Sequence, residues 1–201
     1  MLYMDKIRQP QQERSNEKKN KIIQASYEIF SKIGYYSANT SQIAKRAGVS
    51  TGIIYSYFKD KRDILLYILK IYIDKVTKPL ISFIQKIKTP INYENLISDL
   101  IDLTIKTHKE NSHLHNTLHA LAVSDEDVNT EFESLEYKIT ENISEKLESV
   151  GVKVDNLKEK VHISMNSIQS YAHEFVYSKH DYIDYEAMRK IVVKNVVSLF
   201  E

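Results

Sequence analysis

The sequence predicts an all-α protein of about ten helices, with an N-terminal three-helix domain and a larger helical body. Two observations support this prediction. The 201 residues include only 4 Gly and 3 Pro, so few positions interrupt regular structure. Hydrophobic residues make up 42% of the chain and recur at helical spacing, which is enough to build a core.

The first helix is expected over about 17–33. The residues before it, 1–16, are polar and partly basic, and we expect them to form a loose arm. The apolar positions of this helix repeat every three or four residues, so they should be buried together. They are Ile22, Ala25, Ile29, Phe30 and Ile33.

Residues 39–58 have the pattern of a helix-turn-helix. Asn39 can cap the first short helix, with Gln42 reaching back to it as in a capping box. Gly48 can supply the turn because it takes a positive φ without strain, and Ser50 can cap the second helix. A motif of this kind places its second helix in the major groove of DNA.

Four residues remain on the outward face of the second helix of this motif. They are small, hydroxylic or aromatic and none is acidic, which suits close approach to phosphate oxygens and base edges. The alternative is a helical hairpin in an all-α core, in which the aromatic residue only packs. The four residues are Thr51, Gly52, Tyr55 and Ser56.

A longer pattern of residue types extends on both sides of this motif. It consists of Ile22, Ile23, Ala25, Phe30, Gly34, Tyr35, Ile43, Ala44, Ala47, Gly48, Val49, Ser50, Gly52, Tyr55, Tyr57, Phe58, Lys61 and Leu65. In type and spacing this pattern resembles the DNA-binding domain of the tetracycline-repressor (TetR) family, over roughly 16–76. One mild departure is that Ser26 and Tyr27 stand where an alanine and an apolar residue are expected.

The resemblance implies two domains and three partners. Residues 16–76, with the motif at 39–58, would bind a double-stranded DNA operator, and residues 77–201 would bind a small-molecule effector and form a homodimer. A dimer can read a palindromic site, since one helix-turn-helix contacts only a half-site. The helices at about 125–150 and 156–178 would meet as a four-helix bundle.

The resemblance also implies which residues contact DNA. Thr40 and Ser41 would contact phosphates, and Lys61 would hold the DNA backbone from the start of the fourth helix. With Ser50 and the four outward residues, they complete the set of DNA-binding candidates. The polar arm at 1–16 is either a disordered tail or a further DNA contact.

The charge is divided unevenly along the chain. Residues 1–62 contain 12 Lys and Arg against 5 Asp and Glu, a balance of +7, whereas residues 63–201 contain 16 against 22, a balance of −6. A basic end on an acidic body is expected if only that end meets a polyanion.

Several classes of protein are disfavoured. The chain has no cysteine, so it forms no disulfide. No apolar run approaches the roughly 20 residues that span a bilayer, and no signal peptide is recognisable, so we expect a cytoplasmic protein with no membrane partner. No phosphate-binding loop, dinucleotide turn or nucleophile elbow is present, so we expect neither an enzyme nor a cofactor.

The body is expected to be helical throughout. The fourth helix should begin after Asp60, with Pro79 marking a kink or restart and Pro90 a boundary. Asn156 and Glu159 can form a capping box. The later helices are expected at about 93–109, 113–122, 125–150, 156–177 and 184–200.

A neutral polar stripe along the penultimate helix leaves two alternatives open. It consists of His162, Asn166, Gln169, His173, Tyr177 and His180. It could line a ligand cavity or lie at a dimer interface, since a solvated face would carry Lys and Glu. His115 and His119 could share a helix face as zinc ligands do, but without cysteine or a nearby carboxylate we expect no metal.

The function expected is that of a DNA-binding regulator, most simply a repressor that a small, mostly apolar effector releases from its operator. The alternative is an architectural DNA-binding protein or scaffold without an effector. The candidate effector-binding residues face inward by spacing. They are His108, Tyr137, Asn166, Gln169, Tyr171, His173 and Tyr177.

Overall fold

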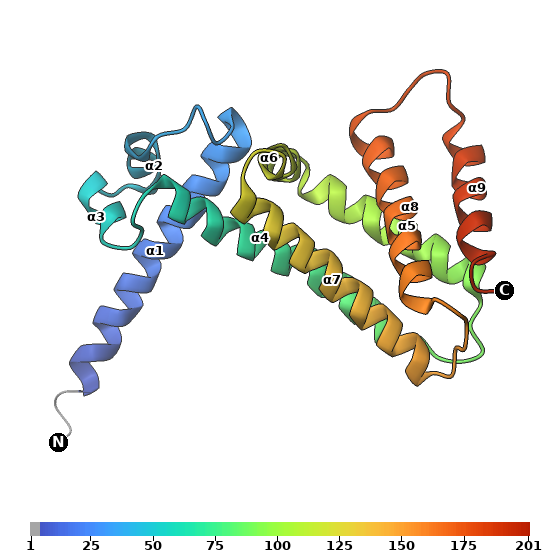
Figure 1. Cartoon of the computed structure of the whole chain (residues 1–201). Helices are drawn as coiled ribbons and strands as arrows, with labels where there is room; N and C mark the ends of the chain where they lie inside the picture. The colour runs from blue at the N-terminus through green and yellow to red at the C-terminus, as the bar shows by residue number, and fades with distance from the viewer. Residues whose placement is uncertain (1–4) are drawn as a thin grey trace. The chain divides into compact units, whose positions relative to one another are not determined.

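The structure, a computed structural model, describes residues 5–201 as an assembly of helices (Figure 1). The prediction of an all-α fold is confirmed. The helices are α1 (Asp5–Ile33), α2 (Thr40–Ala47), α3 (Thr51–Tyr55), α4 (Lys61–Ile84), α5 (Tyr93–Glu110), α6 (Ser112–Ala122), α7 (Glu126–Ser149), α8 (Leu157–Tyr177) and α9 (Tyr185–Val197).

The described residues form nine helices rather than about ten. The difference arises at Pro79, which lies inside α4 and starts no new helix. A proline removes one backbone donor from a helix, and the helix continues here because apolar residues on both sides remain packed. Tyr72 and Ile84, one before and one after the proline, are both buried.

The chain divides into two compact units. The first covers the chain up to Ile71 together with His113–Val128, and the second covers Tyr72–Ser112 and Asn129–Glu201. Helix α6 therefore belongs almost entirely to the first unit. The functional division expected from the sequence, between 76 and 77, stays a prediction.

The first unit is built around α1, α2, α3 and the start of α4. Helix α1 begins by Asp5, so the expectation of a loose arm is wrong for the described residues before 17, and residues 1–4 lie outside the described part. The hydroxyls of Ser15 and Tyr57 lie 3.0 Å apart and join α1 to the turn after α3. Ile33 was expected to be buried but is 40% exposed, because α1 ends at this residue.

The second unit packs α5 against α8 and α9. Its core is apolar and contains Ile97, Ile101, Ile105, Leu147, Leu157, Val161, Ile168, Tyr171, Ala172, Val196, Val197 and Phe200. Arg189 of α9 donates two hydrogen bonds to the carboxylate of Asp102 on α5, at 2.5 and 2.9 Å, and one to the Ser98 carbonyl at 3.0 Å. These bonds fix α9 on α5.

The capping box expected at the start of α8 does not form. Asn156 occupies the N-cap position, but it has a φ of 55° and its side chain makes no capping hydrogen bond. An N-cap side chain normally reaches the helix amides from an extended backbone, which the left-handed conformation does not provide. In the described part of the chain, no helix is both long and apolar enough to cross a membrane.

Candidate functional site

Helix α2 begins and ends as its sequence predicts. The Asn39 side chain accepts a hydrogen bond from the Gln42 backbone N–H at 3.0 Å, and the Gln42 side chain accepts one from the Asn39 N–H at 2.9 Å. Gly48 ends the helix with a φ of 67°, which confirms the expected left-handed turn. The angle between α2 and α3 is thus defined by local chemistry.

The two helices bury one face each and leave the other to solvent. Ile43, Ala44, Ile54 and Phe58 are buried in the first unit. Ser50 holds the N-cap position of α3 in an extended conformation, but the capping hydrogen bond expected from its side chain is absent. The Ser50 side chain is exposed, and a contact from it to DNA stays a prediction.

The structure brings several predicted DNA-binding residues together on the solvent-exposed side of α2 and α3. We call this surface the open face, and it includes Thr40, Ser41, Tyr55 and Ser56. Tyr55 is 54% exposed, and its hydroxyl lies 3.2 Å from the Thr40 hydroxyl. Ser41 and Ser56 are also exposed, and the Ser56 hydroxyl donates to the Ile53 carbonyl at 2.7 Å. The open face therefore carries hydroxyl groups and an aromatic ring without a carboxylate among them.

Gly52, the second residue of α3, has space around it. A Cβ atom added there would meet nothing closer than the Ser50 hydroxyl oxygen at 4.0 Å, and Gly52 does not have a positive φ. The fold of the free chain therefore does not require glycine at this position. A requirement for glycine would come from a partner whose surface approaches the backbone closely.

Lys61, at the start of α4, is held within the chain. Its ammonium donates to the carbonyls of Tyr35 and Ala38, both at 2.8 Å, and lies 4.3 Å from the centre of the Tyr35 ring. Burial lowers the pKa of Lys61 below its ordinary value. These bonds fasten the loop between α1 and α2 to α4, and a contact from Lys61 to DNA stays a prediction.

Arg62, the next residue, pairs with two carboxylates near the start of α7. Its guanidinium binds both oxygens of Asp125, with one bond of 2.9 Å, and reaches Asp127 at 2.5 Å. The Asp125 side chain is only 12% exposed and also accepts from the Val128 N–H at 3.2 Å. The hydrogen bonds from Arg62 hold the pKa of Asp125 below its usual range.

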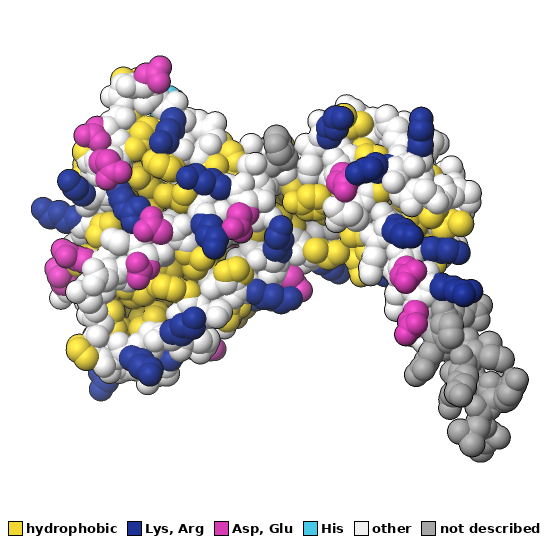
Figure 2. Space-filling model, turned by 180° about the vertical axis from the view of Figure 1, so that it is seen from behind, with side chains coloured by type: hydrophobic (Ala, Val, Ile, Leu, Met, Phe, Trp, Pro, Cys, Tyr) yellow, Lys and Arg dark blue, Asp and Glu magenta, His cyan; other side chains and the backbone are white. Residues whose placement is uncertain are grey.

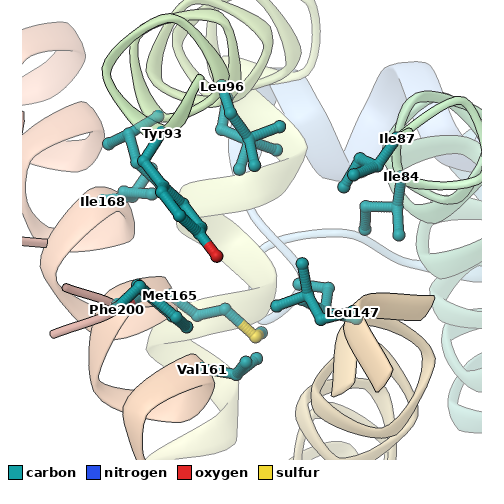
Figure 3. A pocket seen from close by; sticks show the side chains of 13 residues that line it. Ile84, Ile87, Tyr93, Leu96, Leu147, Val161, Met165, Ile168 and Phe200 are labelled. Carbon is teal, nitrogen blue, oxygen red and sulfur yellow. The ribbon is translucent and has the colours of Figure 1, made fainter. Parts of the chain in front are cut away.

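The second unit contains a cavity of about 50 Å³ between α5, α7 and α8 (Figure 3). Apolar side chains form nearly all of its lining. The lining residues are Ile84, Ile87, Tyr93, Leu96, Ile97, Leu100, Ile143, Leu147, Val161, Ser164, Met165, Ile168 and Phe200. None of the seven effector-binding candidates is among them, so their role in binding an effector stays a prediction.

Three of those candidates nevertheless lie together, away from this lining. The rings of His173 and Tyr177 are 4.8 Å apart, and that of His108 lies 6.3 and 5.9 Å from them. The Tyr177 hydroxyl donates to the His108 carbonyl at 2.9 Å, and burial raises the pKa of Tyr177 to about 12. His108 is buried, and that burial lowers its pKa.

The other four candidates are dispersed. Tyr171 is buried and its hydroxyl donates to the Tyr185 carbonyl at 3.1 Å, whereas Tyr137 is 66% exposed and Asn166 and Gln169 face solvent. The residues that line the cavity are apolar and recur at helical spacing. A cavity and a filled core have the same apolar pattern, so the sequence alone does not distinguish them.

The polar stripe of α8 is mostly exposed in the single chain, with His162, Asn166, Gln169 and His173 open to solvent. Large apolar side chains are exposed near it in sequence, with Ile163 54% exposed. Figure 2 shows further hydrophobic side chains at the surface of the larger unit. Of the two alternatives for this stripe, its exposure favours an interface.

The histidine pair of α6 has no third ligand beside it. The His115 and His119 rings lie 4.1 Å apart. Among the described residues, no group of three His, Asp or Glu side chains is placed to hold a metal ion.

The geometry of the first unit, two short helices joined through a left-handed glycine and an open uncharged face on the second, defines a helix-turn-helix domain. A family model of bacterial regulatory proteins, the tetR family, matches residues 22–68. The N-terminal domain of this chain is thus similar to the DNA-binding domain of the tetR family.

Individual relatives support the same assignment. The chain is 41% identical over 75 residues to the HTH-type transcriptional regulator HbdR of Aromatoleum sp. (strain CIB). This match covers 37% of this chain and 33% of HbdR. It is 36% identical over 87 residues to the fatty acid metabolism regulator protein of Bacillus subtilis (strain 168), and this match covers 43% of this chain and 41% of that protein. The chain thus matches less than half the length of these curated relatives.

Most of the chain has a counterpart among solved structures. A putative TetR-family transcriptional regulator from Mesorhizobium loti superposes with a TM-score of 0.72 at 17% identity, covering 92% of this chain and 96% of that one. At this identity the likeness establishes the fold, with a helix-turn-helix domain followed by a larger helical domain.

Proposed function

We propose that this protein is a cytoplasmic transcriptional regulator that binds a palindromic DNA operator as a homodimer. The observation that carries the proposal is the open face of α2 and α3. The hydroxyls of Thr40 and Tyr55 lie within hydrogen-bonding distance there, and the first turn of α2 has no acidic residue. Hydroxyl and aromatic groups on a recognition helix suit contacts to phosphates and base edges. The basic balance of residues 1–62 adds long-range attraction to the polyanion.

Two chains are needed because one helix-turn-helix contacts only one half-site. The exposed stripe of α8 supports an interface on the second unit, and Ile191 of α9 adds an apolar side chain that is 59% exposed. We therefore extend the expected interface, at about 125–150 and 156–178, to include α9.

The regulator would act as a repressor that a small effector releases. The apolar cavity of the second unit supports this proposal over an architectural protein without an effector, because a filled core would offer no space to a ligand. The relative from Bacillus subtilis is named as a regulator of fatty acid metabolism, which is consistent with an effector that has a hydrocarbon chain.

The test is selection of bound sequences from a random double-stranded DNA library by the full chain. We expect an inverted repeat whose half-sites lie one helical turn apart, about 10–10.5 base pairs, and two chains bound per repeat. Tyr55→Phe should weaken this specific binding by about 1 kcal/mol, whereas Tyr36→Phe, which changes an exposed tyrosine outside α2 and α3, should not.

Selected sequences without an inverted repeat, or one chain per site, would contradict the dimeric regulator. Equal effects of the two tyrosine changes would contradict the proposed role of the open face.

A further inference from the structure

The cavity of the second unit contains no charged residue and only two hydroxyl groups. The Ser164 hydroxyl donates to the Lys160 carbonyl at 2.6 Å within α8, so its proton is already used. The Tyr93 hydroxyl points toward the middle of the cavity (Figure 3). In the described part of the chain it makes no hydrogen bond.

Tyr93 is held firmly in this orientation. It is the first residue of α5, next to the N-cap Asn92, whose side chain accepts from the Asn95 N–H at 2.9 Å. The Tyr93 ring stacks on Phe200, with 5.5 Å between centroids and 13° between planes. A capped helix start and a stacked ring leave the hydroxyl little freedom to turn away from the cavity.

We propose that Tyr93 selects the effector, and that the cavity binds a short alkyl chain carrying one neutral oxygen that hydrogen-bonds to the Tyr93 hydroxyl. This inference rests on the proposed effector site and names the chemistry that the site recognises. Alcohols, ketones and esters have the required oxygen.

The lining excludes charged ligands by the free energy of desolvation. An ion buried among apolar groups loses its hydration and finds no opposite charge in this lining. A neutral oxygen loses less hydration free energy than an ion, and a hydrogen bond from the Tyr93 hydroxyl replaces the one it made to water. A tyrosine hydroxyl is protonated at neutral pH and can donate, and burial raises the pKa of Tyr93 further.

The size of the cavity limits the length of the chain. Its volume of about 50 Å³ is several times the roughly 10–15 Å³ that one water molecule needs. The space therefore holds a few carbon atoms as it stands, and a six-carbon chain fits once the flexible side chain of Met165 moves aside.

The test is titration calorimetry of the full chain, without DNA, using three probes of equal carbon number: 1-hexanol, 1-chlorohexane and hexanoate at pH 8. We expect hexanol to bind, and hexanoate to bind at least about tenfold more weakly. In Tyr93→Phe, which keeps the stacked ring, hexanol should bind about three- to tenfold more weakly while chlorohexane is unchanged.

Two matched variants check that the effect belongs to Tyr93. Ser164→Ala removes the other hydroxyl of the lining, and Tyr137→Phe removes an exposed tyrosine hydroxyl outside it. Neither should change the affinity for hexanol. Melting curves of all variants show whether each is folded.

Three results would overturn the proposal: hexanoate binding as tightly as hexanol, Tyr93→Phe weakening hexanol and chlorohexane alike or neither, and no probe binding at all. None of these results touches DNA binding, which is measured separately on the free protein. A failure of this inference is therefore distinguishable from a failure of the proposed regulator.

Discussion

Gly48 and Gly52 lie four residues apart, and the fold requires only the first of them. Gly48 has a φ of 67°, a conformation that costs a residue with a side chain about 1–2 kcal/mol. Gly52 has ordinary helical geometry and room for a Cβ atom. Folding therefore explains the glycine at position 48. The glycine at position 52 would be needed only if a partner approached the backbone closely.

The two alanine variants should separate these roles. Gly48→Ala should lower the free energy of unfolding by about 1 kcal/mol. Gly52→Ala should raise it by roughly 0.5 kcal/mol, since alanine is the better helix former, while weakening operator binding about tenfold or more by keeping the DNA from the backbone. Chemical denaturation and DNA titration measure the two effects. Unchanged operator affinity in Gly52→Ala would remove this position from the interface.

Residue-scale features were predictable where their chemistry is local. The box formed by Asn39 and Gln42 and the turn at Gly48 depend on a few neighbouring residues, so the sequence predicts them correctly. The bonds of Lys61 to the Tyr35 and Ala38 carbonyls join positions more than twenty residues apart. Nothing in the local sequence of Lys61 indicates them.

At the scale of elements, the Arg62 clamp joins α4 to the segment between α6 and α7. We use this name for the contacts of Arg62 with Asp125 and Asp127. All three residues belong to the first unit, and the clamp ties the end of the segment His113–Val128 to the start of α4 within that unit. A two-pronged contact between a guanidinium and a carboxylate is stronger than a single ion pair.

The two carboxylates should differ in their effect on stability. Asp125→Asn should lower the free energy of unfolding by about 1–3 kcal/mol, because it breaks the better buried pair, whereas Asp127→Asn, on a side chain that is 65% exposed, should cost less than about 1 kcal/mol. Denaturant titration at neutral pH gives both values. Equal costs would contradict the ranking by burial.

The pH dependence of the Asp125 contribution has a definite sign. Its pKa in the folded chain is lower than that of an ordinary aspartate, chiefly because Arg62 donates to the carboxylate. The stabilisation is therefore complete above the unfolded pKa and is lost as the pH falls through the folded one. The difference between wild type and Asp125→Asn should shrink only at strongly acidic pH.

Periodicity predicted where the helices lie but not how well each face is filled. Ile97 on α5, and Val161 and Ile168 on α8, belong to apolar faces of the kind that normally form a packed core, and the structure opens a cavity among these residues. Whether apolar side chains meet or leave a gap depends on helix spacing, which no single segment encodes. The contact of Ser15 in α1 with Tyr57 is likewise invisible to periodicity, since the two residues are distant in sequence.

At the scale of the whole molecule, two helices continue from one unit into the other. Helix α4 begins with Lys61 and Arg62 in the first unit and ends at Ile84, which lines the cavity of the second. Helix α7 begins beside the clamp and carries Ile143 and Leu147 to the same cavity. A ligand bound in the cavity would therefore contact α4 and α7, both of which also contribute residues to the first unit.

This continuity makes the proposed release from DNA measurable as a coupling free energy. If hexanol lowers operator affinity by a given factor, the operator must lower hexanol affinity by the same factor, because the two equilibria share one thermodynamic cycle. Factors of roughly 5- to 150-fold are typical of such coupling. The measurement consists of operator titrations with and without saturating hexanol, and hexanol titrations with and without saturating operator.

Tyr93→Phe should weaken hexanol binding to the free and the operator-bound chain alike, leaving the coupling factor unchanged. A ligand that stabilises the free protein but leaves operator affinity untouched would show that the cavity is not linked to DNA binding.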